Sequence, residues 1–222
     1  MENLYSKKAI WIELSVVILW LVLPSILTQF IPYKTSRGTY GDVYHIVYAL
    51  AYIGRVGALG FIVWQSGDSF SSFGIIKDSL PRVALIVIVL LALDAAMMAI
   101  MNPSHILPHV SPSAFSHDSS SSWFSRISFI VAAATMEELI YRSYLITRLK
   151  ELLGSAEWAI VISFILFGCI HIYRGTPGFI SASVFGLILS ITFVRTKSVL
   201  PLAITHSLHN LWLEVASRSF GF

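Results

Sequence analysis

Charged residues are scarce in this sequence of 222 residues. Asp, Glu, Lys and Arg together make up 12% of it, whereas about a quarter of a soluble globular domain is charged. Hydrophobic residues make up 56%, and the mean hydropathy is +0.76. The composition therefore disfavours a soluble domain and is typical of a polytopic membrane protein.

Cysteine is almost absent as well. The single residue, Cys169, lies inside an apolar run, so no intramolecular disulfide can form.

The first apolar run, AIWIELSVVILWLVLPSILTQF, has no small-residue cleavage site, and we expect a retained first helix rather than a signal peptide. The net charge of +3 does not require a nucleic-acid partner, because Lys and Arg of membrane proteins gather in loops.

Long hydrophobic runs, in contrast, recur along the whole chain. Their approximate ranges are 9–30, 43–64, 82–101, 124–147, 155–173, 177–194 and 198–217. We predict an all-α fold, a polytopic bundle of about seven transmembrane helices (between six and eight) that forms a single transmembrane domain over residues 1–222. A short interfacial helix is expected around Phe73 to Leu80.

Two polar features lie outside the spans. The segment NPSHILPHVSPSAFSHDSSSSW contains His105, His109 and His117, and a loop broken by prolines rarely fixes metal ligands, so we favour a solvated loop over a metal site. With the N-terminus inside, the inner loops hold eight Lys and Arg residues against five in the outer loops. This excess predicts a cytoplasmic N-terminus.

The stretch AAATMEELIYRSYLI puts three charges into an apolar span. Each charge at the bilayer centre costs roughly 2.5–3.5 kcal/mol on insertion scales. Glu138 and Arg142 are four residues apart with the acid first, the favourable order for a pair on one helix face. Glu137 points about 100° away from Glu138. We predict a structural Glu138–Arg142 pair and a functional role for Glu137 in proton transfer.

Two later spans carry residues that suit a common polar site. FGCIH places His171 late in the fifth span, and HSLHN places His206 and Asn210 on one face of the seventh. Glu137 lies seventeen residues before Gly154, at the predicted turn, and His171 seventeen after it. In an antiparallel hairpin, equal offsets put two side chains at the same level. We therefore expect these side chains to share a chamber.

The remaining intramembrane polar residues have weaker expectations. His209 is expected to pack or to support the site indirectly. Asp94, Arg55 and His45 are expected to form pairs between helices or to line a water-filled entry. Glu13 lies near the cytoplasmic end of the first span, from which it is expected to reach the membrane interface.

Three motifs in this order resemble one membrane family. EELIYR fits E-E-x-x-x-R, FGCIH fits F-x-x-x-H, and HSLHN fits H-x-x-x-N, each inside an apolar span. The pattern resembles that of the CPBP family of CAAX proteases and bacteriocin-processing enzymes. The match runs from Glu137 to Asn210, 74 residues or about a third of the chain.

The resemblance implies an intramembrane endopeptidase whose core, residues 124–217, carries the motifs. It implies that Glu137 and His171 activate a water molecule, while His206 and Asn210 stabilise the oxyanion. Supporting roles fall to a second set of residues, namely Glu138, Arg142, Phe167 and His209. A metal-free mechanism is favoured, because an arginine beside a metal would repel it.

Zinc at Glu137, His171 and His206 stays open as an alternative. The expected substrate is a peptide or a membrane-tethered protein, of the CAAX-processing or the bacteriocin-processing and immunity type. The expected location is a bacterial cell membrane, with the lipid bilayer as the other partner. Two further functions remain open: a non-catalytic peptide-binding or immunity protein, and a small proton-coupled transporter.

Overall fold

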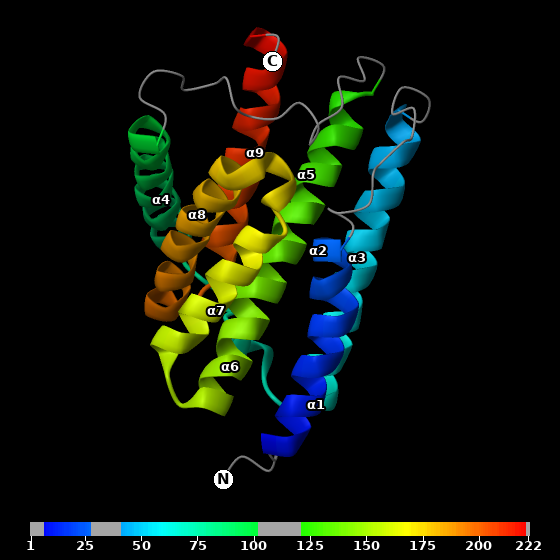
Figure 1. The fold of residues 1–222 in the computed structure, drawn as a ribbon, viewed down its shortest axis with the longest axis vertical. Coiled ribbons are helices and arrows are strands. Elements are labelled where there is room, and N and C mark those ends of the chain that lie inside the picture. The colour runs from blue at the N-terminus through cyan, green and yellow to red at the C-terminus, as the bar shows by residue number, and fades with distance from the viewer. Residues whose placement is uncertain (1–6, 28–40, 102–120, 221–222) are drawn as a thin grey trace. The chain divides into compact units, whose positions relative to one another are not determined.

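All regular secondary structure in the described part of the chain is helical (Figure 1). The computed structural model describes residues 7–27, 41–101 and 121–220. Its α-helices are α1 (Lys7–Val17), α2 (Leu23–Leu27), α3 (Gly41–Gln65), α4 (Leu80–Met101), α5 (Trp123–Glu138), α6 (Ile146–Leu153), α7 (Ala156–Cys169), α8 (Gly175–Thr196) and α9 (Leu200–Phe220). The predicted all-α class is confirmed, whereas His105, His109 and His117 lie outside the described residues.

Four helical segments are long and apolar enough to cross a membrane. They are Lys7–Leu27, Asp42–Gln65, Leu80–Met101 and Ile172–Thr196. Helix α7 is a shorter apolar helix of 14 residues. The other two predicted spans coincide with α9 and with the run from α5 to α6, which carry most of the charged and histidine residues of the expected site. The fold is therefore a polytopic one, as predicted.

The structure divides into two compact units that alternate along the chain. Unit 1 comprises Met1–Pro32, Arg55–Lys77 and Glu138–Val199, and unit 2 comprises Tyr33–Gly54, Asp78–Glu137 and Leu200–Phe222. The chain passes from unit 2 to unit 1 inside α3 and again between the adjacent acids at the end of α5.

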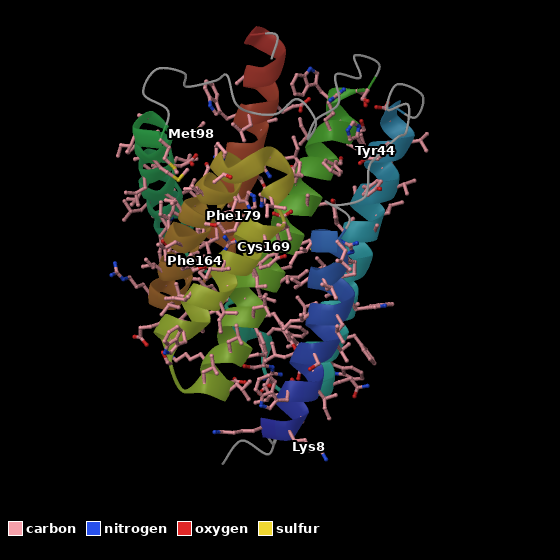
Figure 2. The ribbon with its side chains drawn as sticks, viewed as in Figure 1. Lys8, Tyr44, Met98, Phe164, Cys169 and Phe179 are labelled. Atoms are coloured by element: carbon pink, nitrogen blue, oxygen red, sulfur yellow. The ribbon has the colours of Figure 1, made fainter. Side chains whose placement is uncertain are left out.

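Close contact between α7 and α8 organises unit 1. A Cβ atom built on Gly168 of α7 would lie 2.0 Å from Ser183 Oγ and 3.1 Å from the Phe179 ring of α8. Figure 2 labels Phe179 on α8 and Phe164 on α7. Small residues allow helices to approach closely where no hydrophobic effect drives their association. Gly168 therefore sets how near the two helices lie.

The turn before α7 follows the expectation from the sequence. Helix α6 ends at Gly154, which has a φ of 70°, and its N–H donates to the carbonyl oxygen of Lys150. Glycine suits this left-handed position because it has no Cβ. Ser155 then caps α7 by accepting a hydrogen bond of 3.2 Å from the Trp158 N–H.

The interfacial helix expected at Phe73 to Leu80 was predicted wrongly. A short 3₁₀ helix covers Phe70–Phe73 and ends at Gly74, where φ is 76°. Phe73 is buried, and the Gly74 carbonyl accepts a hydrogen bond of 3.0 Å from the Val199 N–H. A Cβ at Gly74 would lie 2.6 Å from the Phe193 ring. Tertiary packing in unit 1, rather than amphipathic periodicity, decides this segment.

A buried polar network lies in unit 1. Both Nε and Nη2 of Arg148 donate to the Glu13 carboxylate, at 3.0 and 3.2 Å, and the Tyr144 hydroxyl donates to it at 2.7 Å. Arg148 Nη1 also pairs with Asp68 and Glu151. Glu13 is 7% exposed. The expectation that it reaches the membrane interface was wrong, because a buried arginine holds it.

Candidate functional site

The two adjacent acids sit where the helix geometry changes. Helix α5 ends at Glu138 and continues directly as a π-helical stretch, Leu139–Leu145. Single π-helical turns inside α-helices are frequent at functional sites, since they re-aim the side chains that follow. Arg142 lies inside this stretch and is fully buried.

The predicted pair of Glu138 and Arg142 is confirmed. Arg142 Nη1 donates to Glu138 Oε1 at 2.8 Å, and both side chains are 0% exposed. The guanidinium carbon lies 4.1 Å from the centre of the Phe167 ring on α7. A Cβ at Gly186 of α8 would come within 3.0 Å of Arg142 Nη2. The pair therefore ties the π-helical stretch to both helices of the α7–α8 hairpin within unit 1.

In unit 2, Glu137 faces helix α9. Its Oε2 atom lies 3.7 Å from His206 Nε2, longer than a direct hydrogen bond but within ion-pair distance. The Glu137 side chain is 18% exposed and that of His206 is 3% exposed. Asn210, one turn beyond His206 on α9, is half-buried. The structure thus brings the acid of the first motif to the histidine of the third.

His171 lies in a turn, and not late in a helix as predicted. Helix α7 ends at Cys169, the His171 N–H donates to the Gly168 carbonyl at 2.9 Å, and a 3₁₀ turn, Ile172–Arg174, follows. The ring Nδ1 lies 2.9 Å from the Phe167 carbonyl oxygen. A carbonyl can only accept, so Nδ1 carries the proton. In the neutral ring, Nε2 is then the nitrogen that can accept a proton or bind a metal.

His171 belongs to unit 1, whereas Glu137, His206 and Asn210 belong to unit 2. That all four side chains share one chamber stays a prediction.

Asp94 makes one of the expected pairs between helices, and its partner is His209. The His209 Nδ1 lies 2.7 Å from Asp94 Oδ2, and this contact joins α9 to α4 in unit 2. His209 lies three residues after His206 on the same helix. This contact therefore helps to define the rotation of α9 that turns His206 toward Glu137.

The sequence reasoning missed a second contact between α5 and α9. Arg126 Nη1 donates to Glu214 Oε1 at 2.8 Å, and both side chains are 2% exposed. Arg126 lies near the start of the predicted span 124–147 and is one of the five basic residues counted on the outer side. The sequence did contain a pattern that could have predicted this contact. His206, Asn210 and Glu214 are spaced four residues apart, so they line one face of α9. The two contacts fix an antiparallel register of α5 and α9 in unit 2.

The metal question depends on how many ligands converge. Glu137 and His206 are two residues of the kind that bind zinc, and structural or catalytic zinc sites use at least three protein ligands. In the part of the chain that the structure describes, no group of three or more His, Cys, Asp or Glu residues could hold a metal ion. The described geometry therefore supplies a pair and not a ligand set.

Part of the chain matches a known protein family. Residues 119–212 match the family model described as type II CAAX prenyl endopeptidase Rce1-like. The matched range contains the E-E-x-x-x-R, F-x-x-x-H and H-x-x-x-N motifs, together with Arg126. Searches of curated proteins and of solved structures found no match. Residues 119–212 are thus similar to the Rce1-like CAAX endopeptidase family, a family of proteases, and this match together with the apolar helices supports an integral membrane protein.

Proposed function

We propose that the protein is an intramembrane endopeptidase that hydrolyses a peptide bond in a membrane-associated or peptide substrate. The observation that carries the proposal is the approach of Glu137 to His206 inside the segment that matches a protease family. A carboxylate and an imidazole are costly to place in apolar helices. Where two such side chains lie this close together, a functional site is the default explanation. CAAX processing and bacteriocin processing are the candidate reactions, and residues 124–217 form the catalytic core.

In the proposed mechanism, Glu137 and His171 take a proton from a water molecule, which attacks the scissile carbonyl carbon. The tautomer of His171 supports this role, since its Nδ1–H is held by the Phe167 carbonyl and Nε2 is left as the proton acceptor. His206 and Asn210 then donate to the developing oxyanion. One well-placed donor of this kind lowers the activation barrier by about 3–4 kcal/mol.

Glu138 and Arg142 have a positioning role in this proposal. Their buried pair holds the π-helical stretch against Phe167, four residues before His171. Removing either partner would leave a buried charge without compensation, which typically costs about 3–5 kcal/mol. His209, held by Asp94, has the corresponding role on α9.

The decisive variant is Glu137→Gln in the full-length protein reconstituted in liposomes. It keeps the side-chain shape but removes the proton acceptor, so we expect kcat to fall at least about 100-fold. The probe is a quenched fluorescent peptide with an S-farnesyl cysteine as the fourth residue from its C-terminus, tested beside an unprenylated copy. Glu157→Gln, an exposed acid at the start of α7, is the matched control and should cleave normally.

Other outcomes separate the alternatives. Full activity in Glu137→Gln would sink the hydrolytic proposal. A peptide-binding protein would tolerate the isosteric change, and a transporter would show proton-linked flux without cleavage. We propose a metal-free reaction. Loss of cleavage with a chelator and its return with zinc would overturn that part and favour the alternative of zinc at Glu137, His171 and His206.

We further propose that the protein resides in a bacterial cell membrane with a cytoplasmic N-terminus. Arg126 and Arg148 are each held in buried ion pairs, so they do not act as free loop charges. Arg148 is one of the eight basic residues on the inner side and Arg126 one of the five on the outer side, so without them the inner side still has the excess. Labelling of cysteines introduced into a Cys169→Ser background tests the orientation, and labelling at Lys8 from the outside would contradict it.

A further inference from the structure

Two lysines from different helices of unit 1 lie beside the same stretch of backbone, Phe73–Gly74. The guanidinium carbon of Arg148 on α6 lies 4.9 Å from the centre of the Phe73 ring, and Lys150 follows Arg148 by two residues. A Cβ atom on Gly74 would lie 3.2 Å from the carbonyl oxygen of Lys197, the residue that ends α8. The last turn of α6 and the end of α8 therefore meet at this stretch.

The charges of the two lysines are close enough to act on each other. Partial loss of hydration on burial, and then the charge of Lys150, lower the pKa of Lys197 from its ordinary value. Both residues are exposed, and in the part of the chain that the structure describes neither ammonium group has a carboxylate within 4.0 Å. Glu151, beside Lys150, is bound to Arg148 at 2.9 Å, and Glu157 accepts a hydrogen bond of 2.7 Å from a serine hydroxyl. Two neighbouring cations without an acid between them suit an anionic ligand.

The side chain of Lys197 is held in place although its backbone is strained. Its φ is 53°, a conformation that glycine adopts without cost, and residues kept in such conformations cluster at functional sites. The ammonium group lies 5.7 Å from the centre of the Phe193 ring, which is buried and would lie 2.6 Å from a Cβ on Gly74. The cation–π contact therefore keeps the ammonium group near the Phe73–Gly74 stretch.

The two lysines lie at the level expected for lipid headgroups. Lys197 directly follows the membrane-length segment Ile172–Thr196. Trp158, at the start of α7, is 63% exposed, and exposed tryptophans of membrane proteins gather at the membrane interface. Leu153, three residues after Lys150 and so its neighbour on the surface of α6, is 44% exposed. An anion bound here would have apolar surface beside it, as the phosphate of a phospholipid has acyl chains beside it.

We propose that Lys150 and Lys197 together bind the phosphate group of an anionic phospholipid. Arg148 Nε donates to Glu13 of α1 at 3.0 Å, which places the site on the side of the membrane where α1 begins. Basic pockets between transmembrane helices commonly bind anionic headgroups. We choose a lipid over a free phosphate ion because exposed apolar side chains border the pair. The inference does not depend on the proposed hydrolysis.

The test counts lipids bound to the full-length protein by native mass spectrometry in detergent. Phosphatidylglycerol and phosphatidylcholine are titrated separately, and the Kd of each is obtained from the bound fraction. Changing Lys150→Gln and Lys197→Gln together should raise the Kd for phosphatidylglycerol about 10- to 30-fold, since each lysine near an anionic headgroup contributes about 5-fold. The Kd for phosphatidylcholine should stay the same. Lys150→Arg with Lys197→Arg should keep most of the affinity, because the charges remain.

The matched control changes Lys7→Gln and Lys8→Gln together. These exposed lysines at the start of α1 lie on the same side of the membrane, and Figure 2 labels Lys8. The control removes the same total charge and should keep the affinity for phosphatidylglycerol. An equal loss in both double variants would overturn the inference, because it would show a general effect of net charge.

Three other results would also contradict the proposed site. One is equal binding of the two lipids by the unaltered protein, and another is an equal loss for both lipids when Lys150 and Lys197 are changed. Displacement of phosphatidylglycerol by excess ammonium phosphate would assign the site to the free ion instead of a lipid. Thermal unfolding checks that each variant is folded. If the Lys150 and Lys197 double variant does not fold, each single change to Gln should still weaken phosphatidylglycerol binding about 5-fold, and no change in either would overturn the site.

Discussion

Lys197 is the one residue other than glycine with a positive φ among residues 7–27, 41–101 and 121–220. It ends α8 with a φ of 53°, and its N–H donates to the Phe193 carbonyl at 2.8 Å. A side chain with a Cβ is strained in this left-handed conformation, which glycine adopts without cost.

Glycine and alanine at position 197 should therefore differ in their effect on the stability of the protein. Lys197→Gly and Lys197→Ala both remove the ammonium group that lies 5.7 Å from the centre of the Phe193 ring. They differ only in the Cβ. We expect the glycine variant to be more stable than the alanine variant by about 1 kcal/mol. That corresponds to a Tm higher by about 2–4 °C in detergent. Equal melting temperatures would show that the backbone is not strained.

At the residue scale, sequence separation decided which contacts were predictable. Glu138 and Arg142 are four residues apart on one helix, and their pairing followed from helical geometry. The partners in the Asp94–His209 and Arg126–Glu214 pairs are 115 and 88 positions apart. Many arrangements of helices satisfy the same composition, so these partners became identifiable only in the packed structure.

At the scale of elements, the α7–α8 hairpin depends on the lack of a side chain at Gly168. Ser183 Oγ, its nearest neighbour on α8, is a buried atom without a hydrogen-bond partner in the described structure. Removing that oxygen costs no hydrogen bond. The contact can therefore be tested from both helices.

Gly168→Ala should destabilise the protein by about 1–3 kcal/mol, the usual cost of overpacking a dense interface. Adding Ser183→Ala removes the clashing oxygen and should recover part of the loss, while Ser183→Ala alone should be nearly neutral. Gly60→Ala is the matched control, because a Cβ there meets nothing within 4 Å, and we expect no loss of stability. Thermal unfolding in detergent measures all four variants. An unchanged Tm in Gly168→Ala would contradict the close contact.

Element boundaries were predictable where local chemistry sets them. Gly154 and Ser155 end one helix and cap the next, as residues of these types commonly do. The stretch after Phe73 and the end of α7 before His171 were not predictable in this way. The stretch after Phe73 depends on contacts with the distant residues Phe193 and Val199. The end of α7 depends on a tight turn in which His171 bonds to the carbonyl groups of Phe167 and Gly168, and hydropathy does not reveal such a turn.

At the scale of the whole molecule, unit 1 is held together by a polar network that joins distant parts of the chain. Arg148 binds Glu13, which is 135 positions away, and Asp68, which is 80 positions away. Arg148 is 1% exposed. Three carboxylates around one buried guanidinium make the network sensitive to loss of the cation.

Arg148→Met should destabilise the protein by about 3–5 kcal/mol, because it leaves the buried Glu13 without its cation. Glu13→Gln in the same protein should restore part of this loss, so the two changes should be less harmful together than their sum. Arg195→Met, at an exposed site, should change stability by no more than about 0.5 kcal/mol. Unfolding is followed by temperature or denaturant in detergent. Strict additivity of the two changes would contradict a coupled network.

The sequence by itself determined that this is an all-α membrane protein, where its apolar helices begin within a few residues, and which residues carry the three motifs. These properties follow from composition, hydropathy and spacing along one helix, which act over a few residues. Only the tertiary structure decided that Asp94 and Arg126 pair with residues of α9, and that Glu13 is buried. These contacts and this burial depend on which helix faces pack together. Packing is a property of the folded chain and not of any segment within it.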